Sequence, residues 1–237
     1  MVPESVGVLL TVLFGMFVGA PLVARELEQG IHRLVWTQSI TRLRWLSMKF
    51  ALTVGAGILL FSLLFVLLFW WSTPLYQFRT NRLTPPGFDA MGPVFPASAV
   101  LALTLGMLAG ALTRRTVPAM LLTLVLILAI RLPVENLLRP NYLPAITVSQ
   151  PLGPNLEEQP IPGAGKWIIE VGMVDPHGDK TNQASCPTAQ PCGYRMYYTY
   201  QPINRCWSFQ WIEASMYLTF SVLALALTIW LVRCRLS

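Results

Sequence analysis

The stretch FALTVGAGILLFSLLFVLLFWW, residues 50–71, contains no charged side chain. A helix of roughly 20 apolar residues is long enough to cross the hydrocarbon core of a bilayer. Four further runs have the same character: residues 5–24, 94–113, 117–130 (continuing less purely to 138) and 211–232. The sequence therefore predicts an all-α integral membrane protein with five transmembrane helices.

The composition agrees with this class. Of 237 residues, 54% are hydrophobic and 12% are charged, whereas a soluble domain carries about 25% charged residues. These values exclude a disordered chain and argue against a soluble enzyme. The formal net charge of +6 would suggest nucleic acid in a soluble protein, but here membrane orientation explains the basic residues, so we expect no nucleic-acid partner.

The basic residues indicate an orientation. Five Lys or Arg residues lie in the connection 25–49, Arg114 and Arg115 lie between the third and fourth runs, and Arg233 and Arg235 lie in the tail. Short loops rich in Lys and Arg remain on the cytoplasmic side. We therefore expect these three segments and the C-terminus to be cytoplasmic. The N-terminus then lies outside, and we expect that the first helix of the full architecture is missing.

The second long connection predicts a small external cap. Residues 131–210 are rich in Pro and Gly, with two stretches typical of strands, 166–174 and 194–200, and a turn signal at 175–178. We divide the chain into three regions. Residues 1–138 contain helices one to four and the cytoplasmic segment 25–49. Residues 139–210 form a cap that holds a short β-hairpin, and residues 211–237 contain the last helix and the tail.

A few side chains suggest specific interactions. Cys186 and Cys192 flank five residues in the external segment, where oxidation is permitted. We expect a disulfide there, with two free thiols as the alternative. Arg131 and Glu135 are four residues apart on one helical face near a membrane boundary, which predicts an ion pair more than a substrate contact. Glu213, at the start of the last span, is interpreted in the same way.

No catalytic chemistry is predicted. The sequence contains no HExxH, no GxSxG, no pair of intramembrane aspartates and no GxxxxGK[ST] phosphate loop. Its two histidines, His32 and His177, fall on opposite sides of the membrane by the expected orientation. We expect no catalytic residue, no metal site and no bound cofactor in this chain.

The segment 25–49 is the most informative connection. Its apolar residues recur at helical spacing and Gly30 marks a bend, which favours two short amphipathic helices at the inner membrane surface, the second starting near Thr41. Such a segment can simply lie on anionic lipid. Its acidic residues and its polar turn at 36–39 favour a docking site for a cytoplasmic partner.

The stretch GAPLVARELEQGIHRLVWTQSITRLRWLSMK, residues 19–49, resembles the cytoplasmic segment of bacterial type-2 ABC transporter permeases, the exporter-type membrane subunits. Residues 82–85, 88–90, 110–120, 200–202, 209–213 and 233–236 are similar to the same family.

The resemblance implies six spans per permease subunit, with both termini cytoplasmic. It implies further that two permease subunits, identical or different, pair with two copies of a separate ATP-binding subunit, which holds ATP and Mg. It also implies that segment 25–49 is the coupling segment that contacts that subunit, through Glu26, Glu28, Gly30, Arg33, Trp36, Thr37, Gln38 and Arg42.

The leading hypothesis is the membrane-spanning subunit of an ATP-driven exporter, embedded in membrane lipid. The alternatives are a non-transporting tether or regulatory subunit, a truncated and inactive permease, and a membrane enzyme acting on lipid. The uniformly apolar spans do not specify the substrate.

Overall fold

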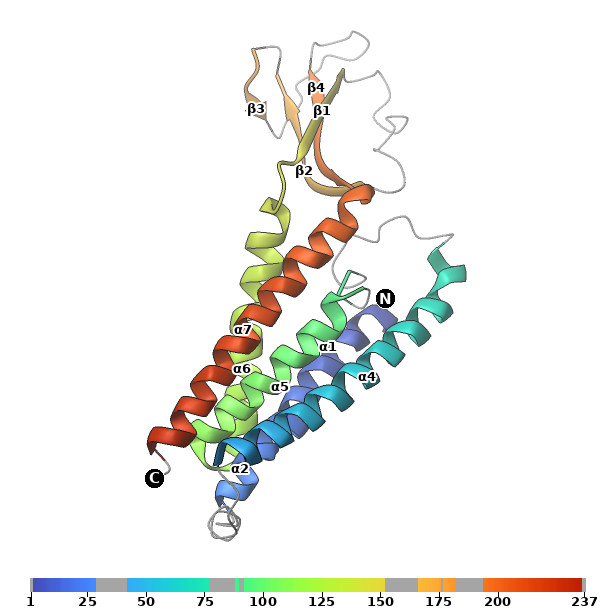
Figure 1. Cartoon of the computed structure of the whole chain (residues 1–237). Coiled ribbons are helices and arrows are strands. Elements are labelled where there is room, and N and C mark those ends of the chain that lie inside the picture. Colours follow the sequence, from blue (N-terminus) through green and yellow to red (C-terminus); the bar gives the residue numbers. More distant parts are fainter. Residues whose placement is uncertain are drawn as a thin grey trace.

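The computed structural model describes residues 2–28, 42–76, 88–89, 92–151, 166–175, 177–181 and 194–235. Within them, five helical stretches are long and apolar enough to cross a membrane (Figure 1), which confirms the five predicted spans. The first span consists of α1 (Val2–Phe14), the π-helical turn η1 (Gly15–Gly19) and α2 (Ala20–Glu28). The second and third are α4 (Arg42–Tyr76) and α5 (Val94–Thr113). The fourth is α6 (Thr116–Pro133), continued by the π-helical turn η2 (Val134–Leu138), and the fifth is α7 (Cys206–Arg235).

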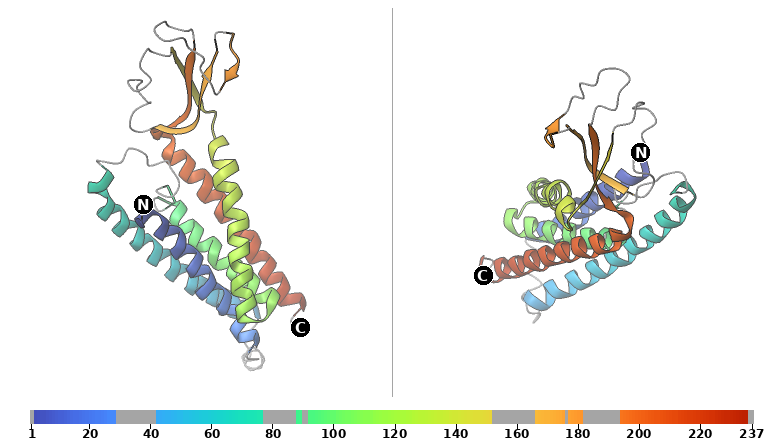
Figure 2. Two further views of the ribbon diagram at one scale, coloured as in Figure 1. Left: turned by 180° about the vertical axis from the view of Figure 1, so that it is seen from behind. Right: turned by 90° about the horizontal axis from the view of Figure 1, so that it is seen from above.

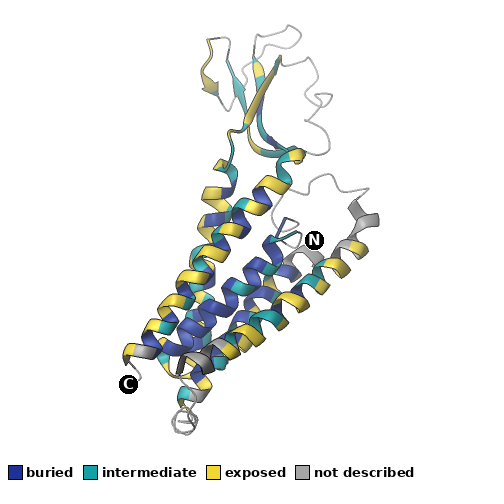
Figure 3. Ribbon diagram, viewed as in Figure 1, coloured by how far each residue is buried: buried dark blue, intermediate teal, exposed yellow. Residues whose placement is uncertain are grey.

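Helix α5 is the centre of the bundle. In its span 89% of the residues are buried, against 11% in the span of α4, and α5 contacts α1, η1, α2, α4, α6 and α7. Figure 3 shows this contrast as a dark central helix beside the largely exposed α4. The apolar exposed faces of the outer helices are those that lipid or another membrane chain can cover.

Small residues permit the closest approach in the bundle. A Cβ atom added at Gly106 would lie 2.6 Å from the carbonyl oxygen of Gly15 and 2.7 Å from the backbone nitrogen of Ala20. One added at Gly110 would lie 2.7 Å from the carbonyl oxygen of Ala20. The small residues at 106 and 110 therefore place the backbone of α5 directly against η1 and α2.

Helix α4 packs less tightly and through aromatic rings. Phe61 is buried, with its ring centroid 5.1 Å from that of Phe14 and 5.0 Å from that of Phe95. The short second amphipathic helix expected near Thr41 is not a separate element, because α4 begins at Arg42 and runs unbroken for 35 residues. The bend predicted at Gly30 lies outside the described residues.

A four-stranded antiparallel sheet extends beyond one end of the bundle (Figures 1 and 2), here called the sheet end. Its order is β1-β4-β2-β3, with β1 Ile146–Pro151, β2 Lys166–Val174, β3 Lys180–Thr181 and β4 Arg195–Pro202. The predicted strands 166–174 and 194–200 are confirmed as β2 and β4. The expected hairpin is wrong in extent, since β1 and β3 complete a larger sheet.

The turn signal at 175–178 joins β2 to β3. The Asp175 carboxylate accepts hydrogen bonds from the backbone N–H groups of His177 and Asp179, at 2.9 and 2.8 Å. The opposite end of the bundle, here called the far end, carries the end of α2, the connection from α5 to α6, and the C-terminus (Figure 1).

Candidate functional site

Four charged side chains are buried together at the sheet end. Asp89 precedes α5, Arg131 lies near the end of α6, Arg139 begins the 3₁₀ turn η3 (Arg139–Asn141), and Glu213 lies in the second turn of α7. Their side chains are between 0% and 7% exposed. We call these four residues the buried ion network.

Arg139 is the centre of the network and is completely buried. Its Nε and Nη2 atoms donate to the two carboxylate oxygens of Glu213, at 2.9 and 2.7 Å, and Nη2 also donates to Asp89 Oδ1 at 2.5 Å. The guanidinium carbon lies 4.5 Å from the ring centroid of Phe88. This geometry makes Arg139 a bridge between α7 and the segment that precedes α5.

Arg131 balances the second oxygen of Asp89. Its Nη2 atom lies 2.7 Å from Asp89 Oδ2, so two cations face two carboxylates. Tyr217, one turn after Glu213, donates from its hydroxyl to Glu213 Oε1 at 2.8 Å. A buried pair whose partners are complete is tolerated, whereas removal of one partner costs about 3–5 kcal/mol because a charge is left uncompensated.

Arg131 forms its ion pair with Asp89, a partner that the sequence did not suggest. Glu135, the predicted partner, is half-buried one turn further on, in the π-helical turn η2. The pair between Arg131 and Glu135 stays a prediction. The expected structural role of Glu213 is supported, with Arg139 as its partner.

The same region is fixed by glutamine amides. Gln210 Nε2 donates to the Phe88 carbonyl oxygen at 2.7 Å, and Gln210 Oε1 accepts from the Val94 N–H at 3.2 Å. In β4, Gln201 Nε2 donates to the Leu143 carbonyl oxygen at 2.7 Å, just after η3. The sheet, α6, α7 and the entry to α5 are thus held together around the network.

Sequence reasoning missed Asp89 and Arg139 as members of this site. Asp89 lies between the spans in a Pro- and Gly-rich connection, and Arg139 precedes a proline, so neither falls on a helical face. One signal in the sequence could have found them. Two basic and two acidic residues lie at the sheet-end boundaries of three spans, where a lone charge is costly, and equal numbers of opposite charges indicate pairing.

At the far end, the first span and α6 are joined through Glu28. Its Oε2 atom accepts hydrogen bonds from the hydroxyl and the backbone N–H of Thr116, at 2.7 and 3.1 Å. Thr116 is the first residue of α6, so the carboxylate satisfies an N–H at that helix N-terminus. These hydrogen bonds, the hydroxyl bond foremost, hold the pKa of Glu28 below its ordinary value.

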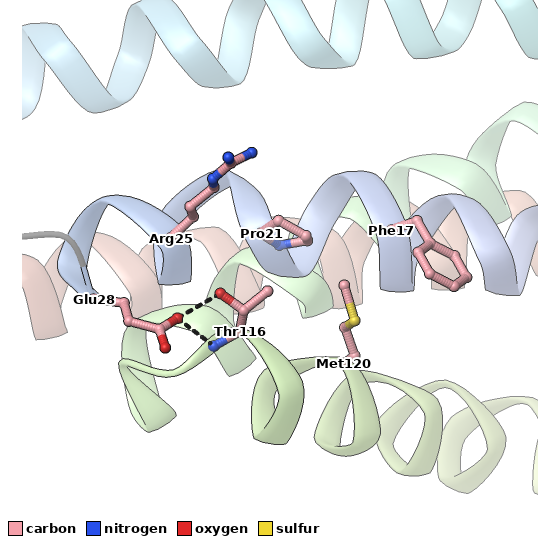
Figure 4. Close-up of a pocket in the computed structure, with 6 residues that line it drawn as sticks. All are labelled: Phe17, Pro21, Arg25, Glu28, Thr116 and Met120. Carbon is pink, nitrogen blue, oxygen red and sulfur yellow. Dashed lines mark hydrogen bonds between the residues drawn. The ribbon is translucent and has the colours of Figure 1, made fainter.

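An open groove lies beside this contact (Figure 4). It has a volume of about 620 Å³ and is lined by Phe17, Pro21, Arg25, Glu28, Thr116 and Met120. The first four come from η1 and α2, and the last two from α6.

The other residues predicted for partner docking are described only in part. Glu26 lies in α2, and Arg42 is the first residue of α4. Gly30, Arg33, Trp36, Thr37 and Gln38 lie outside the described residues, as do Cys186 and Cys192. The docking surface and the disulfide therefore stay predictions.

Within the described ranges, no group of three or more His, Cys, Asp or Glu side chains is placed to hold a metal ion. The model of one protein family, described as ABC-2 membrane transporter related, matches residues 2–139, which include the first four spans. No curated protein and no solved structure matches the chain.

Proposed function

Since the chain belongs to the ABC-2 membrane transporter related family, we propose that it is the membrane-spanning permease subunit of an ATP-driven exporter. The family and the five spans make it a multi-pass membrane component of a transporter. The proposal adds that a separate subunit binds and hydrolyses ATP, and that the substrate path forms where this chain meets a second permease subunit.

The observation that carries the coupling part of this proposal is the contact between Glu28 and Thr116. Helix α2 extends past the apolar window, which ends at Arg25, and its last residue holds the start of α6 through two hydrogen bonds. A displacement of residues 29–41 by a docked partner would therefore act on the first span and on α6 together.

Close packing supports transmission from there to the centre of the bundle. Gly106 and Gly110 of α5 lie against the backbone of η1 and α2 without intervening side chains. Close-packed interiors transmit displacement rather than absorb it. The far end is accordingly the side on which we place the ATP-binding subunit.

The charge distribution supports a cytoplasmic far end. Arg25, Arg42, Arg114 and Arg115 all lie near this end of the helices, as does the C-terminus. The positive-inside rule then places the sheet outside the cell.

The test is reconstitution with the candidate ATP-binding subunit in liposomes, followed by measurement of ATP hydrolysis. An exporter subunit stimulates its partner's ATPase activity, and the variant Glu26→Lys/Glu28→Lys reduces association while membrane insertion persists. Glu170→Lys, on the sheet, is the matched charge reversal that leaves association unchanged. Association without stimulation would instead indicate a tether, and unchanged association of the double variant would contradict the assigned docking segment.

A further inference from the structure

We propose that the groove between α2 and α6 binds one phospholipid with an anionic head group. An acyl chain lies along Phe17, Pro21 and Met120, and the phosphate lies at Arg25. The groove shares Glu28 with the proposed docking segment, but the lipid proposal does not rest on the proposed function.

The groove is built by two matched helical stripes. Phe17, Pro21, Arg25 and Glu28 are spaced by four, four and three residues, which places them along one face of the first span. Thr116 and Met120, four residues apart, form the facing stripe on α6. Figure 4 shows the two helices side by side, joined at one end by the hydrogen bonds between Glu28 and Thr116, with the Arg25 side chain directed away from α6 at the edge of the groove.

The apolar part of the groove lies at membrane depth. Both stripes fall within or next to the windows that can span the bilayer, residues 7–25 and 116–141. Phe17 is 60% exposed there. An extended hydrocarbon chain can cover this surface without burying any polar atom.

The charge at the mouth of the groove selects the head group. The Glu28 carboxylate accepts hydrogen bonds from Thr116 and keeps its negative charge, so it offsets one of the two nearby arginines, Arg25 and Arg115. Arg25 makes no ion pair with any side chain that the structure describes. Arg115 lies close enough to contribute to the lowered pKa of Glu28. The described mouth therefore retains positive charge next to an apolar groove.

An apolar groove with a basic boundary matches a lipid phosphate better than a cationic or uncharged ligand. Basic pockets between transmembrane helices recognise phosphate head groups in this way. A peptide would instead leave backbone polar groups unsatisfied at membrane depth. Binding in this groove therefore requires both the acyl chain and the phosphate of the lipid.

The experiment is native mass spectrometry of the purified full-length chain, titrated in mild detergent with dioleoyl-phosphatidylglycerol or dioleoyl-phosphatidylcholine. The wild type should retain one phosphatidylglycerol in preference to phosphatidylcholine. Arg25→Gln should weaken phosphatidylglycerol binding about fivefold, the effect of about one basic residue near an anionic surface. Met120→Trp, which fills the groove, should remove the bound lipid of both types.

The matched controls are Arg195→Gln, an exposed arginine of the sheet, and Val222→Trp, 65% exposed on α7. Both should bind like the wild type. If Met120→Trp elutes as an aggregate, Phe17→Trp tests the same space from the other helix. Equal retention of the two lipids, groove variants that match the controls, or displacement of the lipid by free glycerol phosphate at equal concentration would each overturn the proposal.

Discussion

Arg139 and Glu213 are 74 residues apart in the chain and form a two-bond pair in which both side chains are fully buried. The pair joins the turn after α6 to the start of α7, and Asp89 adds the segment before α5. Three helices are thus fixed relative to one another at the end where the sheet begins. The ion network therefore constrains the relative positions of these helices at the sheet end.

Loss of the central cation should destabilise the fold more than loss of the pair. Arg139→Met leaves the carboxylates of Glu213 and Asp89 without their main partner, which should cost about 3–5 kcal/mol. Arg139→Met combined with Glu213→Leu should recover part of this loss. Thermal unfolding in detergent, monitored by size-exclusion chromatography, measures the stability of the single and the double variant. Additive effects of the two substitutions would contradict the coupling between Arg139 and Glu213.

The close packing of α5 predicts that one added methyl group strongly lowers the stability of the fold. Gly106→Ala should cost about 1–3 kcal/mol, because the new Cβ would meet the backbone of η1 and α2. Gly55→Ala in α4 is the control, since nothing lies within 4 Å of its Cβ position, and it should be neutral or stabilising by up to about 1 kcal/mol. Similar melting temperatures for the two variants would refute the packing.

Gly92 tests the link between α7 and the entry to α5. Gly92 has a φ of +67°, and an added Cβ would lie 2.8 Å from Gln210 Oε1. Gly178→Ala has a similar backbone strain at φ +97° but open space around it. Gly92→Ala should therefore lower the melting temperature more than Gly178→Ala does. Equal decreases in the melting temperature of the two variants would mean that Gln210 does not hold the segment before α5.

The contact of Glu28 with Thr116 predicts a pH dependence. The pKa of Glu28 is lowered in the folded chain, so its stabilising effect is present at neutral pH and is lost as the pH falls through this lowered value, below the ordinary range of a glutamate. The difference in melting temperature between the wild type and Glu28→Gln should shrink in that range. A difference that persists at low pH would show that protonation of Glu28 is not responsible.

Much of the helical fold could be predicted because bilayer crossing imposes a simple rule. Uncharged runs such as 50–71 and 94–113 have no alternative to a helix at membrane depth. The contact of Gly106 and Gly110 with the first span was not predicted, because small residues permit close packing without specifying a partner. Strand β1 was missed because its apolar–polar alternation covers only residues 146–149 and ends at Pro151, within a connection rich in Pro and Gly.

The buried ion network could be predicted only in part. Arg131 and Glu213 were recognised as costly charges near the membrane, but their partners depend on tertiary structure. Asp89 comes from a connection 42 residues before Arg131, a separation that follows from their numbers, and local spacing cannot reveal such a pair. Glu135 lies in the π-helical turn η2, and no periodic pattern in the sequence marks that turn.

We propose that this chain acts with a separate ATP-binding subunit. The most direct measurement is affinity purification of the full chain from native membranes in mild detergent, with quantitative mass spectrometry of the retained proteins. We expect an ATP-binding subunit at a stoichiometric ratio, which is lost in Glu26→Lys/Glu28→Lys and kept in Glu170→Lys. Recovery of the intact, well-expressed chain without any ATP-binding protein would contradict it.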